Sequence, residues 1–311
     1  MTEFYEEELD RYCYWQLERE KIRIKKEVLK QEPPWTDDPI LQEFKFCQVF
    51  REDDRTTRWF RTHIREPLRD KPSVLMATVI FRWFNYIETG RTLIEQDLLL
   101  NWDRKKAIAE ITKQPKWVTG AYIIKTPNGM DKVTGVAECV SHMWQDREYL
   151  IDTLEKPDAS LEKTWHLLRD YPYMGPFMAY EVVTDLRHTY LLENADDIMT
   201  WANAGPGAMR GLNRLTGREL SFSQRSHDWN GEMQELFALV LNRLDRSEFR
   251  SFNLLSPYEM REIEGGLCEF DKYSRIYKKE GRTKSIFKHN KELPLVEDLI
   301  EGESIYVVNG E

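Results

Sequence analysis

The sequence has few cysteines and no long hydrophobic run. Its 311 residues include only 4 cysteines, which are scattered without C-x-x-C spacing, so neither a zinc site nor a disulfide framework is expected. The longest clean apolar run, Leu75 to Phe81, is too short to cross a bilayer. The first residues are acidic and lack the basic and then apolar pattern of a signal peptide. We therefore expect a cytoplasmic protein with reduced thiols and no membrane association.

Motifs that bind metals or nucleotides are also missing. The histidines have neither H-E-x-x-H nor H-x-x-E-H spacing, which predicts no catalytic metal held by the protein. No Gly-x-x-x-x-Gly-Lys-Ser/Thr loop is present to cradle the phosphates of a nucleotide, because the segment that starts at Gly281 lacks the leading glycine spacing. The sequence predicts no resident cofactor and no kinase chemistry of its own.

The residues that are present favour a folded domain. Hydrophobic residues make up 41% and aromatic residues 12% of the chain, which excludes an extensively disordered protein. A net charge of −9 does not by itself favour nucleic acid, but the segment 272–291 is basic, with Glu280 as its single acid. It also carries Tyr273 and Tyr277 among the charges. The basic C-terminal segment 256–291 is therefore a candidate phosphate-binding surface, and a plain solvated face is the alternative.

Most of the chain has helical periodicity. A long amphipathic helix is expected over Tyr5–Gln31, stopped by Pro33-Pro34, and an apolar core helix over Ser73–Tyr86. Side chains suited to helix N-caps define further starts. The other expected helices run from a capping box at Thr92–Glu95 to about Asn101, from Asp103 to near Pro115, over Ser160–Asp170, and from a capping box at Ser256–Glu259.

One interval has a different pattern. The semi-apolar runs Val118–Lys125 and Lys132–Cys139 flank a Pro-Asn-Gly turn that ends at Gly129. Asn-Gly between two such runs is typical of a tight turn between antiparallel strands. The sequence therefore predicts a mainly α fold with a small β-hairpin excursion.

The segment Leu167–Leu186 has the pattern of a helix, a short turn and a second helix. Pro172, Met174, Gly175 and Ala179 occupy the positions at which the helix–hairpin–helix of DNA repair enzymes has Pro, an apolar residue, Gly and a small residue. Gly permits close approach of the backbone, and amides at a helix start can hold a DNA phosphate. The segment resembles that motif, which implies DNA contacts from Tyr173, Met174 and Gly175; the alternative is an ordinary corner between helices.

A second glycine-rich segment follows at Asn203–Leu215. Gly205 and Gly207 open a helix with exposed amides that can seat an anion, and Arg210 lies on one face with Arg214. The alternative is a glycine-rich loop selected for packing. Together the two segments resemble the helix–hairpin–helix DNA glycosylases. The resemblance implies a two-lobed helical fold for residues 1–311 as a single domain, with the hairpin lobe at about residues 150–220.

Two departures from the glycosylases concern their catalytic groups. Gly205 stands where those enzymes have the catalytic Asp, and Phe177 where bifunctional members have the Schiff-base Lys. Without the carboxylate or the amine, the oxocarbenium-like sugar is neither stabilised nor trapped. The resemblance therefore implies a glycosylase-like scaffold with a different reaction.

A set of short motifs in a fixed order resembles the α-glutamyl/putrescinyl thymine pyrophosphorylase family, which acts in phage DNA thymine hypermodification. The same helical module occurs in phage 5-hydroxymethyluracil DNA kinases. The motifs that carry the resemblance are Glu18-Arg19-Glu20, Arg51-Glu52-Asp53-Asp54-Arg55, Arg82-Trp83-Phe84-Asn85, Gly120-Ala121-Tyr122, Gly175-Pro176-Phe177 and Leu267-Cys268-Glu269-Phe270-Asp271-Lys272-Tyr273.

This resemblance implies a transferase that replaces the pyrophosphate of 5-pyrophosphoryloxymethyluracil in double-stranded DNA with an amino acid or amine. The base must leave the duplex, pyrophosphate needs cations or amides, and the incoming amine needs a proton acceptor. Candidate acceptors are Asp53, Asp54 and Asp185. Candidate pyrophosphate ligands are Arg19, Arg51, Arg55, Arg82, Gly205 and Gly207. Candidate base-pocket residues are Trp83, Phe84, Tyr180 and Trp201. Candidate DNA contacts, besides those of the hairpin, are Arg210, Lys278 and Lys279.

The residues leave other interpretations open. Asp53 and Asp54 can instead be a helix cap and a surface ion pair. A base-excision glycosylase would need a replacement carboxylate, for which Asp196 and Asp197 are nearest. A non-catalytic helix–hairpin–helix subunit that delivers DNA to a kinase is a third possibility. Mg²⁺ can accompany the pyrophosphate, and a phage-encoded enzyme would work in the host cytoplasm. The sequence does not identify the nucleophile.

Overall fold

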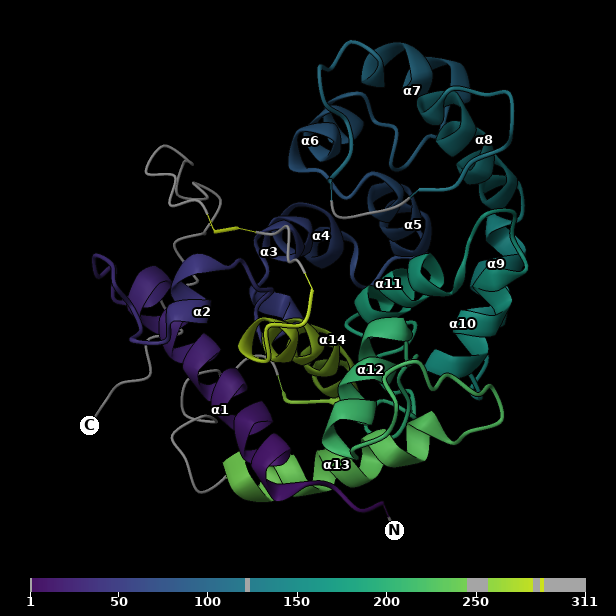
Figure 1. The fold of residues 1–311 in the computed structure, drawn as a ribbon. Coiled ribbons are helices and arrows are strands. Elements are labelled where there is room, and N and C mark those ends of the chain that lie inside the picture. Colours follow the sequence, from purple (N-terminus) through teal and green to yellow (C-terminus); the bar gives the residue numbers. More distant parts are fainter. Residues whose placement is uncertain (1, 121–123, 245–256, 282–285, 288–311) are drawn as a thin grey trace. The chain divides into compact units, whose positions relative to one another are not determined.

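The computed structural model describes residues 2–120, 124–244, 257–281 and 286–287 (Figure 1). The chain divides into two compact units. Unit 1 combines Met1–Asp54 with Met199–Glu311, and unit 2 is the continuous segment Arg55–Ile198. The division at residue 199 passes through the predicted hairpin lobe of about residues 150–220.

Unit 1 is built around its last described helix, α14 (Met260–Tyr277). The elements that pack against this helix are α1 (Glu6–Arg23), α2 (Pro39–Glu43), the 3-10 turn η2 (Arg51–Asp53), α12 (Pro206–Leu215) and α13 (Trp229–Leu244). The long N-terminal helix predicted from the sequence is present as α1, which continues into a π-helical turn before Pro33. That π-helical turn is η1 (Ile24–Val28).

Glycines bring α12 and α14 close together. A Cβ atom at Gly211 would lie 2.4 Å from the carbonyl oxygen of Leu267, and one at Gly207 would lie 2.4 Å from the sulfur of Cys268. A side chain at Gly211 would meet backbone atoms and would require the helices to separate, whereas one at Gly207 would first displace the Cys268 side chain. Gly207 therefore has the packing role that the sequence left open for this segment.

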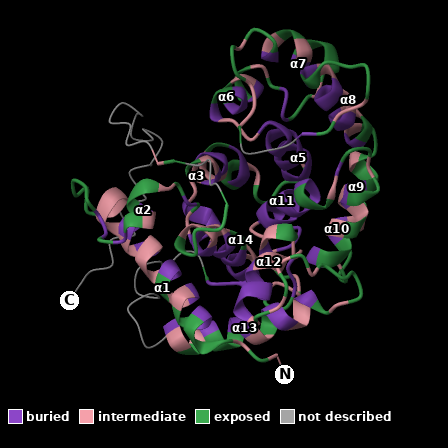
Figure 2. Ribbon diagram, viewed as in Figure 1, coloured by how far each residue is buried: buried purple, intermediate pink, exposed green. Residues whose placement is uncertain are grey.

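Unit 2 is organised around α5 (Val74–Phe84), in which all residues are buried (Figure 2). This confirms the apolar core helix predicted over Ser73–Tyr86. Helices α6, α8, α9 and α11 pack against α5. The other elements of unit 2 are α3 (Arg55–Phe60), η3 (Arg61–Arg65), α4 (Glu66–Leu68), α6 (Ile87–Glu95), α7 (Arg104–Ile111), α8 (Lys132–Gln145), α9 (Arg147–Leu154), α10 (Leu161–Arg169) and α11 (Pro176–Leu186).

The predicted cap of α7 is confirmed, and a second side-chain cap begins α10, the helix expected over Ser160–Asp170. The Asp103 side chain accepts a hydrogen bond from the amide of Lys106 at the start of α7. Ser160 likewise accepts one from the amide of Lys163 and begins α10. Both side chains satisfy amides that a helix start leaves without an intrahelical partner.

The predicted second strand of the β-hairpin is wrong. Residues Lys132–Cys139 belong to helix α8, whose first turn is capped by the Asp131 side chain. Val133, Val136 and Val140 follow the helical period and are all buried, so tertiary packing selects the helix over the local Asn-Gly signal. Residues 121–123, in the predicted first strand, lie outside the described residues. Within the described ranges the β structure is one isolated antiparallel bridge, between Phe44 and Ile286.

Two predicted helix starts are also displaced. Thr92 lies inside α6, where its hydroxyl donates to the carbonyl of Glu88, and the helix ends at Glu95 rather than near Asn101. The capping box of α14 uses Glu259 and Glu262, so this helix begins later than predicted; Ser256 is outside the described residues. No helix in the described part of the chain combines the length and apolar character that a membrane span requires.

Candidate functional site

A group of charged side chains is buried in unit 1 around the turn η2. Arg51, Glu52 and Asp53 are only 8%, 5% and 7% exposed. Charged residues are almost never buried unless they are paired, so this turn is held by specific electrostatic contacts. We call Glu20, Arg23, Arg51, Asp53, Asp54 and Glu262 the η2 cluster.

Arg23 joins the N-terminal helix to this turn. Its guanidinium lies 2.6 Å from the carboxylate of Glu20, one helical turn earlier on α1, and 3.2 Å from the carboxylate of Asp53. The Glu20 side chain is fully buried. Asp53 is therefore engaged in a buried ion pair, not in the surface ion pair that the alternative interpretation of the sequence expected.

Asp54 directly follows the turn η2, and both burial and nearby positive charges act on its carboxylate. Its carboxylate accepts a hydrogen bond of 3.1 Å from the amide of Gln48. Burial raises the pKa of Asp54, and the positive charges of Arg51 and Arg19 act in the opposite direction. Arg19 also donates to the carbonyl of Cys47 at 3.1 Å. The structure thus brings Arg19, Arg51 and Asp54 together within unit 1.

Glu262 is a member of the cluster that sequence reasoning missed. Its carboxyl accepts from the amide of Glu259 at 3.0 Å and from the amide of Arg51 at 3.5 Å, so it connects α14 with η2. Burial, together with the nearby charge of Glu259, raises the pKa of Glu262 to about 8. The Glu259-x-x-Glu262 spacing at the start of α14 is the sequence signal for this residue. The capping box was instead predicted three residues earlier, at Ser256–Glu259.

The η2 cluster has the components that proton transfer and anion binding require. Guanidinium groups bind phosphate and carboxylate oxygens, and a carboxyl with a raised pKa can exchange a proton near neutral pH. Carboxyl groups perturbed by burial beside specific charges are frequent at functional sites. The cluster is therefore the strongest candidate site in unit 1.

The glycine-rich start of α12 is less open to anions than predicted. A Cβ atom at Gly205 would have as its nearest neighbour a carboxylate oxygen of Glu264, at 3.8 Å. Arg210 and Arg214 both bind the buried carboxylate of Asp271, at 2.9 and 2.8 Å. The Arg210 side chain is still 42% exposed, so it remains a candidate DNA contact.

Arg82 and Asp185, predicted as a pyrophosphate ligand and a proton acceptor, bind each other in unit 2. Two nitrogens of Arg82 contact the two carboxylate oxygens of Asp185, one of them at 2.9 Å, and the side chains are 2% and 0% exposed. Arg82 also donates to Asn85 and Thr57. This arrangement is a structural link between α5 and α11.

The predicted base-pocket aromatics are core residues. Trp83, Phe84 and Tyr180 in unit 2 are 1%, 0% and 4% exposed, and Trp201 in unit 1 is 8% exposed. Phe84 packs edge-to-face on Trp117. Arg55 begins α3 and is exposed, so it is available to an anion. The structure assigns Arg55 and Arg82 to unit 2, and Arg19, Arg51, Gly205 and Gly207 to unit 1.

The segment predicted as a helix–hairpin–helix turn is the connection between α10 and α11, which pack against each other; we call this connection the α10–α11 hairpin. The indole of Trp165 donates to the carbonyl of Pro176 at 2.9 Å and fixes the start of α11. Met174 is buried, whereas Tyr173, at a φ of 63°, is 43% exposed. A Cβ atom at Gly175 would meet nothing within 4 Å, so no internal contact explains a glycine there.

Other candidate residues have partners within their own unit. Lys278 forms an ion pair of 2.7 Å with Glu8, and Lys279 is exposed. Residues 282–285 and 288–291 of the predicted basic segment lie outside the described residues.

Asp197, the replacement carboxylate of the glycosylase alternative, accepts from the amides of Leu161 and Glu162 at 2.8 and 2.9 Å and so caps α10. In the described ranges, no three His, Cys, Asp or Glu side chains are grouped as metal ligands.

The sequence model of a known family, the helical domain of 5-hmdU DNA kinase, matches residues 6–283. The chain belongs to this family. The residues matched by the family model include the η2 cluster and the α10–α11 hairpin. The predicted relationship to the helical module of 5-hydroxymethyluracil DNA kinases is thereby confirmed.

A relative within the family is the 5-hmdU DNA kinase of Bacillus phage SP10. The two sequences are 24% identical over 300 residues, which cover 87% of this chain and 45% of the phage protein. The chain therefore spans less than half the length of this relative. No solved structure matches the chain.

Proposed function

We propose that this protein, a member of the family of 5-hmdU DNA kinase helical domains, modifies thymine-type bases in phage DNA. Its substrate is double-stranded DNA that carries 5-pyrophosphoryloxymethyluracil, and its reaction replaces the pyrophosphate with an amino acid or an amine. Membership of the family supports the link to 5-hydroxymethyluracil in DNA. The η2 cluster is the observation that supports the transferase reaction.

The reaction breaks the bond between the exocyclic CH₂ of the base and the pyrophosphate oxygen, which leaves with the electron pair. A C–N bond forms to the incoming amine, which gives up one proton. Arg51 and Arg19 supply positive charge for the leaving group, and Mg²⁺ can accompany the released pyrophosphate. Asp54 is the proposed proton acceptor. Burial raises its pKa, and the positive charges of Arg51 and Arg19 act in the opposite direction and favour the ionised carboxylate.

Duplex binding is assigned to the α10–α11 hairpin. Gly175 has open space where a side chain would be, and the amides at the start of α11 can approach a phosphate. This proposal adopts the helix–hairpin–helix interpretation of the sequence. The basic residues Arg210, Lys278 and Lys279 would add sequence-independent affinity that weakens with salt.

The test uses duplex DNA carrying 5-pyrophosphoryloxymethyluracil, incubated with the protein and candidate amino acids or amines. Nucleosides are then released by digestion and weighed by mass spectrometry. Asp54→Asn is expected to reduce product formation about 100-fold or more, in line with the loss of a general base. Arg243→Gln is the matched control, because Arg243 forms exposed ion pairs with Glu6 and Asp10 in unit 1. Equal turnover of Asp54→Asn and the wild type would refute the assignment.

The second candidate is a DNA-binding component that delivers substrate to a kinase. It is favoured by the match to a kinase helical domain. Here the protein would form no new nucleoside with any amine, but would increase phosphorylation of 5-hydroxymethyluracil DNA by a partner kinase. Asp54→Asn would leave that stimulation unchanged, whereas Gly175→Ala would reduce it.

A further inference from the structure

The α10–α11 hairpin carries two exposed aromatic side chains. Phe177, in the first turn of α11, is 51% exposed, more than any other Phe or Trp in the described ranges, and Tyr173 is 43% exposed. A single apolar residue at a surface is ordinary, but two aromatic rings on one short turn form an aromatic surface. The hairpin therefore presents this surface to its surroundings.

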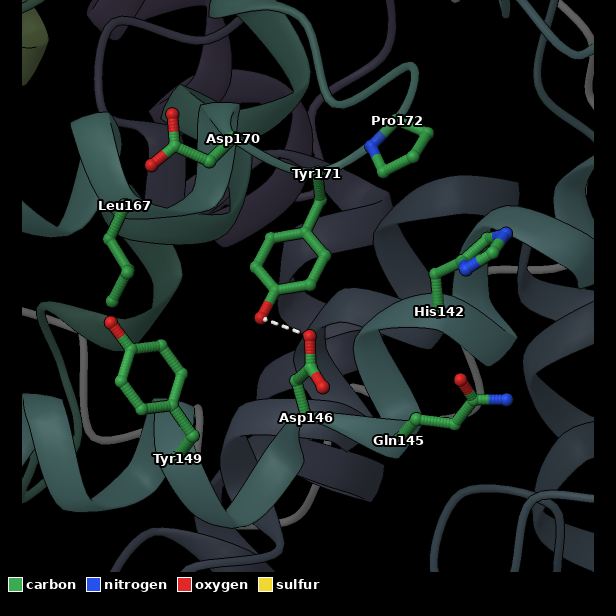
Figure 3. A pocket seen from close by; sticks show the side chains of 8 residues that line it. All are labelled: His142, Gln145, Asp146, Tyr149, Leu167, Asp170, Tyr171 and Pro172. Carbon is green, nitrogen blue, oxygen red and sulfur yellow. Dashed lines mark hydrogen bonds between the residues drawn. The ribbon is translucent and has the colours of Figure 1, made fainter.

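The start of the hairpin is fixed to the N-terminus of α9. The Tyr171 hydroxyl donates to the carboxylate of Asp146, the N-cap residue of α9, at 3.1 Å, in a hollow of about 340 Å³ that Pro172 also lines (Figure 3). Tyr173 follows with a φ of 63°, in the left-handed region that disfavours residues with a Cβ atom. Its ring is nevertheless exposed, so burial of this side chain does not compensate for the strained backbone.

The end of the hairpin is fixed through Pro176, whose carbonyl accepts a hydrogen bond of 2.9 Å from the indole of Trp165. Met178 and Ala179, which follow Phe177, are buried and anchor the first turn of α11 in unit 2. The backbone of Phe177 is therefore held on both sides. Its ring is presented from a fixed position, which limits the conformational entropy lost when a ligand binds.

A ring in this position can meet a nucleobase only when that base has left the duplex. The amides of the same helical turn are the groups assigned above to a DNA phosphate, and paired bases are stacked inside the duplex. Base–aromatic stacking is favourable for every base, because each base has a π-face. The Arg169 guanidinium, 4.2 Å from the centre of the Trp165 ring, adds a positive charge near the hairpin. Asp170 follows it in sequence, so ring stacking, and not local charge, is the basis for recognition.

We propose that Phe177 stacks on a nucleobase that is unpaired or displaced from the duplex. The protein accordingly binds DNA that contains an unpaired base more tightly than a fully paired duplex, because no base pair has to be opened. This inference rests on the proposed assignment of DNA binding to the α10–α11 hairpin, and it adds the base contact and the state of the base that is selected. It requires neither the leaving group nor the amine of the transferase reaction.

The experiment compares two labelled duplexes that are identical except that one carries a single unpaired thymine. Fluorescence anisotropy with the full chain, without any amine, gives the two dissociation constants. We expect the wild type to bind the duplex with the unpaired thymine at least about fivefold more tightly. Phe177→Ala should reduce this ratio to near one and keep the affinity for the paired duplex within about twofold, since no phosphate contact is removed. Phe177→Trp should retain the preference.

The matched control is Leu100→Ala, because Leu100 is an exposed apolar side chain of unit 2 between α6 and α7; its ratio should equal that of the wild type. Circular dichroism establishes that each variant is folded. Phe177→Leu keeps the apolar bulk without the aromatic face, should also lose the preference, and keeps the test valid if the alanine variant is not folded.

A wild-type ratio near one, absence of binding to either duplex, or a wild-type ratio in folded Phe177→Ala overturns the proposal. Failure of the proposed duplex contact gives a different result, since Gly175→Ala would then bind the paired duplex as tightly as the wild type. A protein that shows the preference and forms no new nucleoside would contradict the transferase reaction alone.

Discussion

Arg82 on α5 and Asp185 on α11 form a buried two-point ion pair, although 103 positions separate them in the sequence. Thr57 and Asn85 accept further hydrogen bonds from the Arg82 guanidinium. The positive charge is therefore compensated inside the core of unit 2, where an uncompensated charge would be costly.

Replacement of Asp185 by Asn should destabilise unit 2 strongly. The Arg82 charge would remain buried without its carboxylate, which costs on the order of 3–5 kcal/mol. Urea unfolding followed by circular dichroism measures this. The Arg82→Met, Asp185→Leu double variant should be more stable than Asp185→Asn alone, because no charge is left behind. If both variants match the wild type in stability, the pair has no structural role.

The glycines of α12 should differ in their tolerance of alanine. Gly211→Ala places a methyl group against a backbone oxygen of α14, so we expect a loss of about 1–3 kcal/mol. Gly205→Ala has its nearest neighbour at 3.8 Å and should leave stability almost unchanged. Thermal and chemical unfolding test the contrast. A Gly211→Ala protein as stable as Gly205→Ala would contradict the close packing of α12 on α14.

Glu262 should make stability fall as pH rises. Its pKa is raised from the ordinary 4.5 to about 8, so the folded state holds this proton more tightly than the unfolded chain. The stabilisation is complete below about pH 4.5 and is lost progressively as pH rises toward 8. Glu262→Gln mimics the protonated form and should flatten the decline, which is of the order of a few kcal/mol. Urea titrations from pH 5 to 9 measure both proteins; parallel curves would exclude Glu262 as the cause.

Asp197→Ala should weaken the start of α10. It removes the acceptor of two backbone N–H groups, at Leu161 and Glu162, with an expected cost of about 1–2 kcal/mol. Chemical unfolding checks this value. The same variant tests the glycosylase alternative, because a catalytic Asp197 would be required for release of free base. We expect neither Asp197→Ala nor the wild type to release free base when it is incubated with modified DNA.

Gly175→Ala should separate folding from DNA binding. The backbone at this position has a φ of −68°, which any residue adopts, and the added methyl group meets no atom of the protein. Stability should therefore be retained, while close approach of a duplex should be hindered and affinity reduced three- to tenfold. Fluorescence anisotropy with labelled duplex measures this, and Gly120→Ala, also in open space, is the control. Unchanged affinity would remove the hairpin from the DNA surface.

Local patterns were sufficient for much of the helical structure. The apolar stretch before Tyr86, the cap at Asp103 and the helix over Ser160–Asp170 are properties of neighbouring residues, and the structure confirms them. The failure at α8 has the opposite origin. Asn128-Gly129 is a strong local turn signal, but burial of Val133 and its helical neighbours in the core decides the structure that follows.

The candidate site could be predicted only in part for a related reason. Arg51, Asp53 and Asp54 are adjacent in sequence and were identified as a group. Glu262 lies 211 positions from Arg51, so its contact with η2 depends on the tertiary fold. Single-sequence patterns do not record such pairings, and for the same reason Arg82 and Asp185 were assigned separate roles instead of one shared bond.

The chain leaves unit 1 directly after Asp54 and returns to it at Met199. Residues 55–198 are thus inserted as one uninterrupted stretch into a body assembled from both flanking portions. A single gene fragment can encode the insert, whereas the surrounding body requires an engineered splice between positions 54 and 199. Exchange of that stretch between relatives would transfer the α10–α11 hairpin as one cassette, and would leave Arg51, Asp54 and Glu262 with their original host.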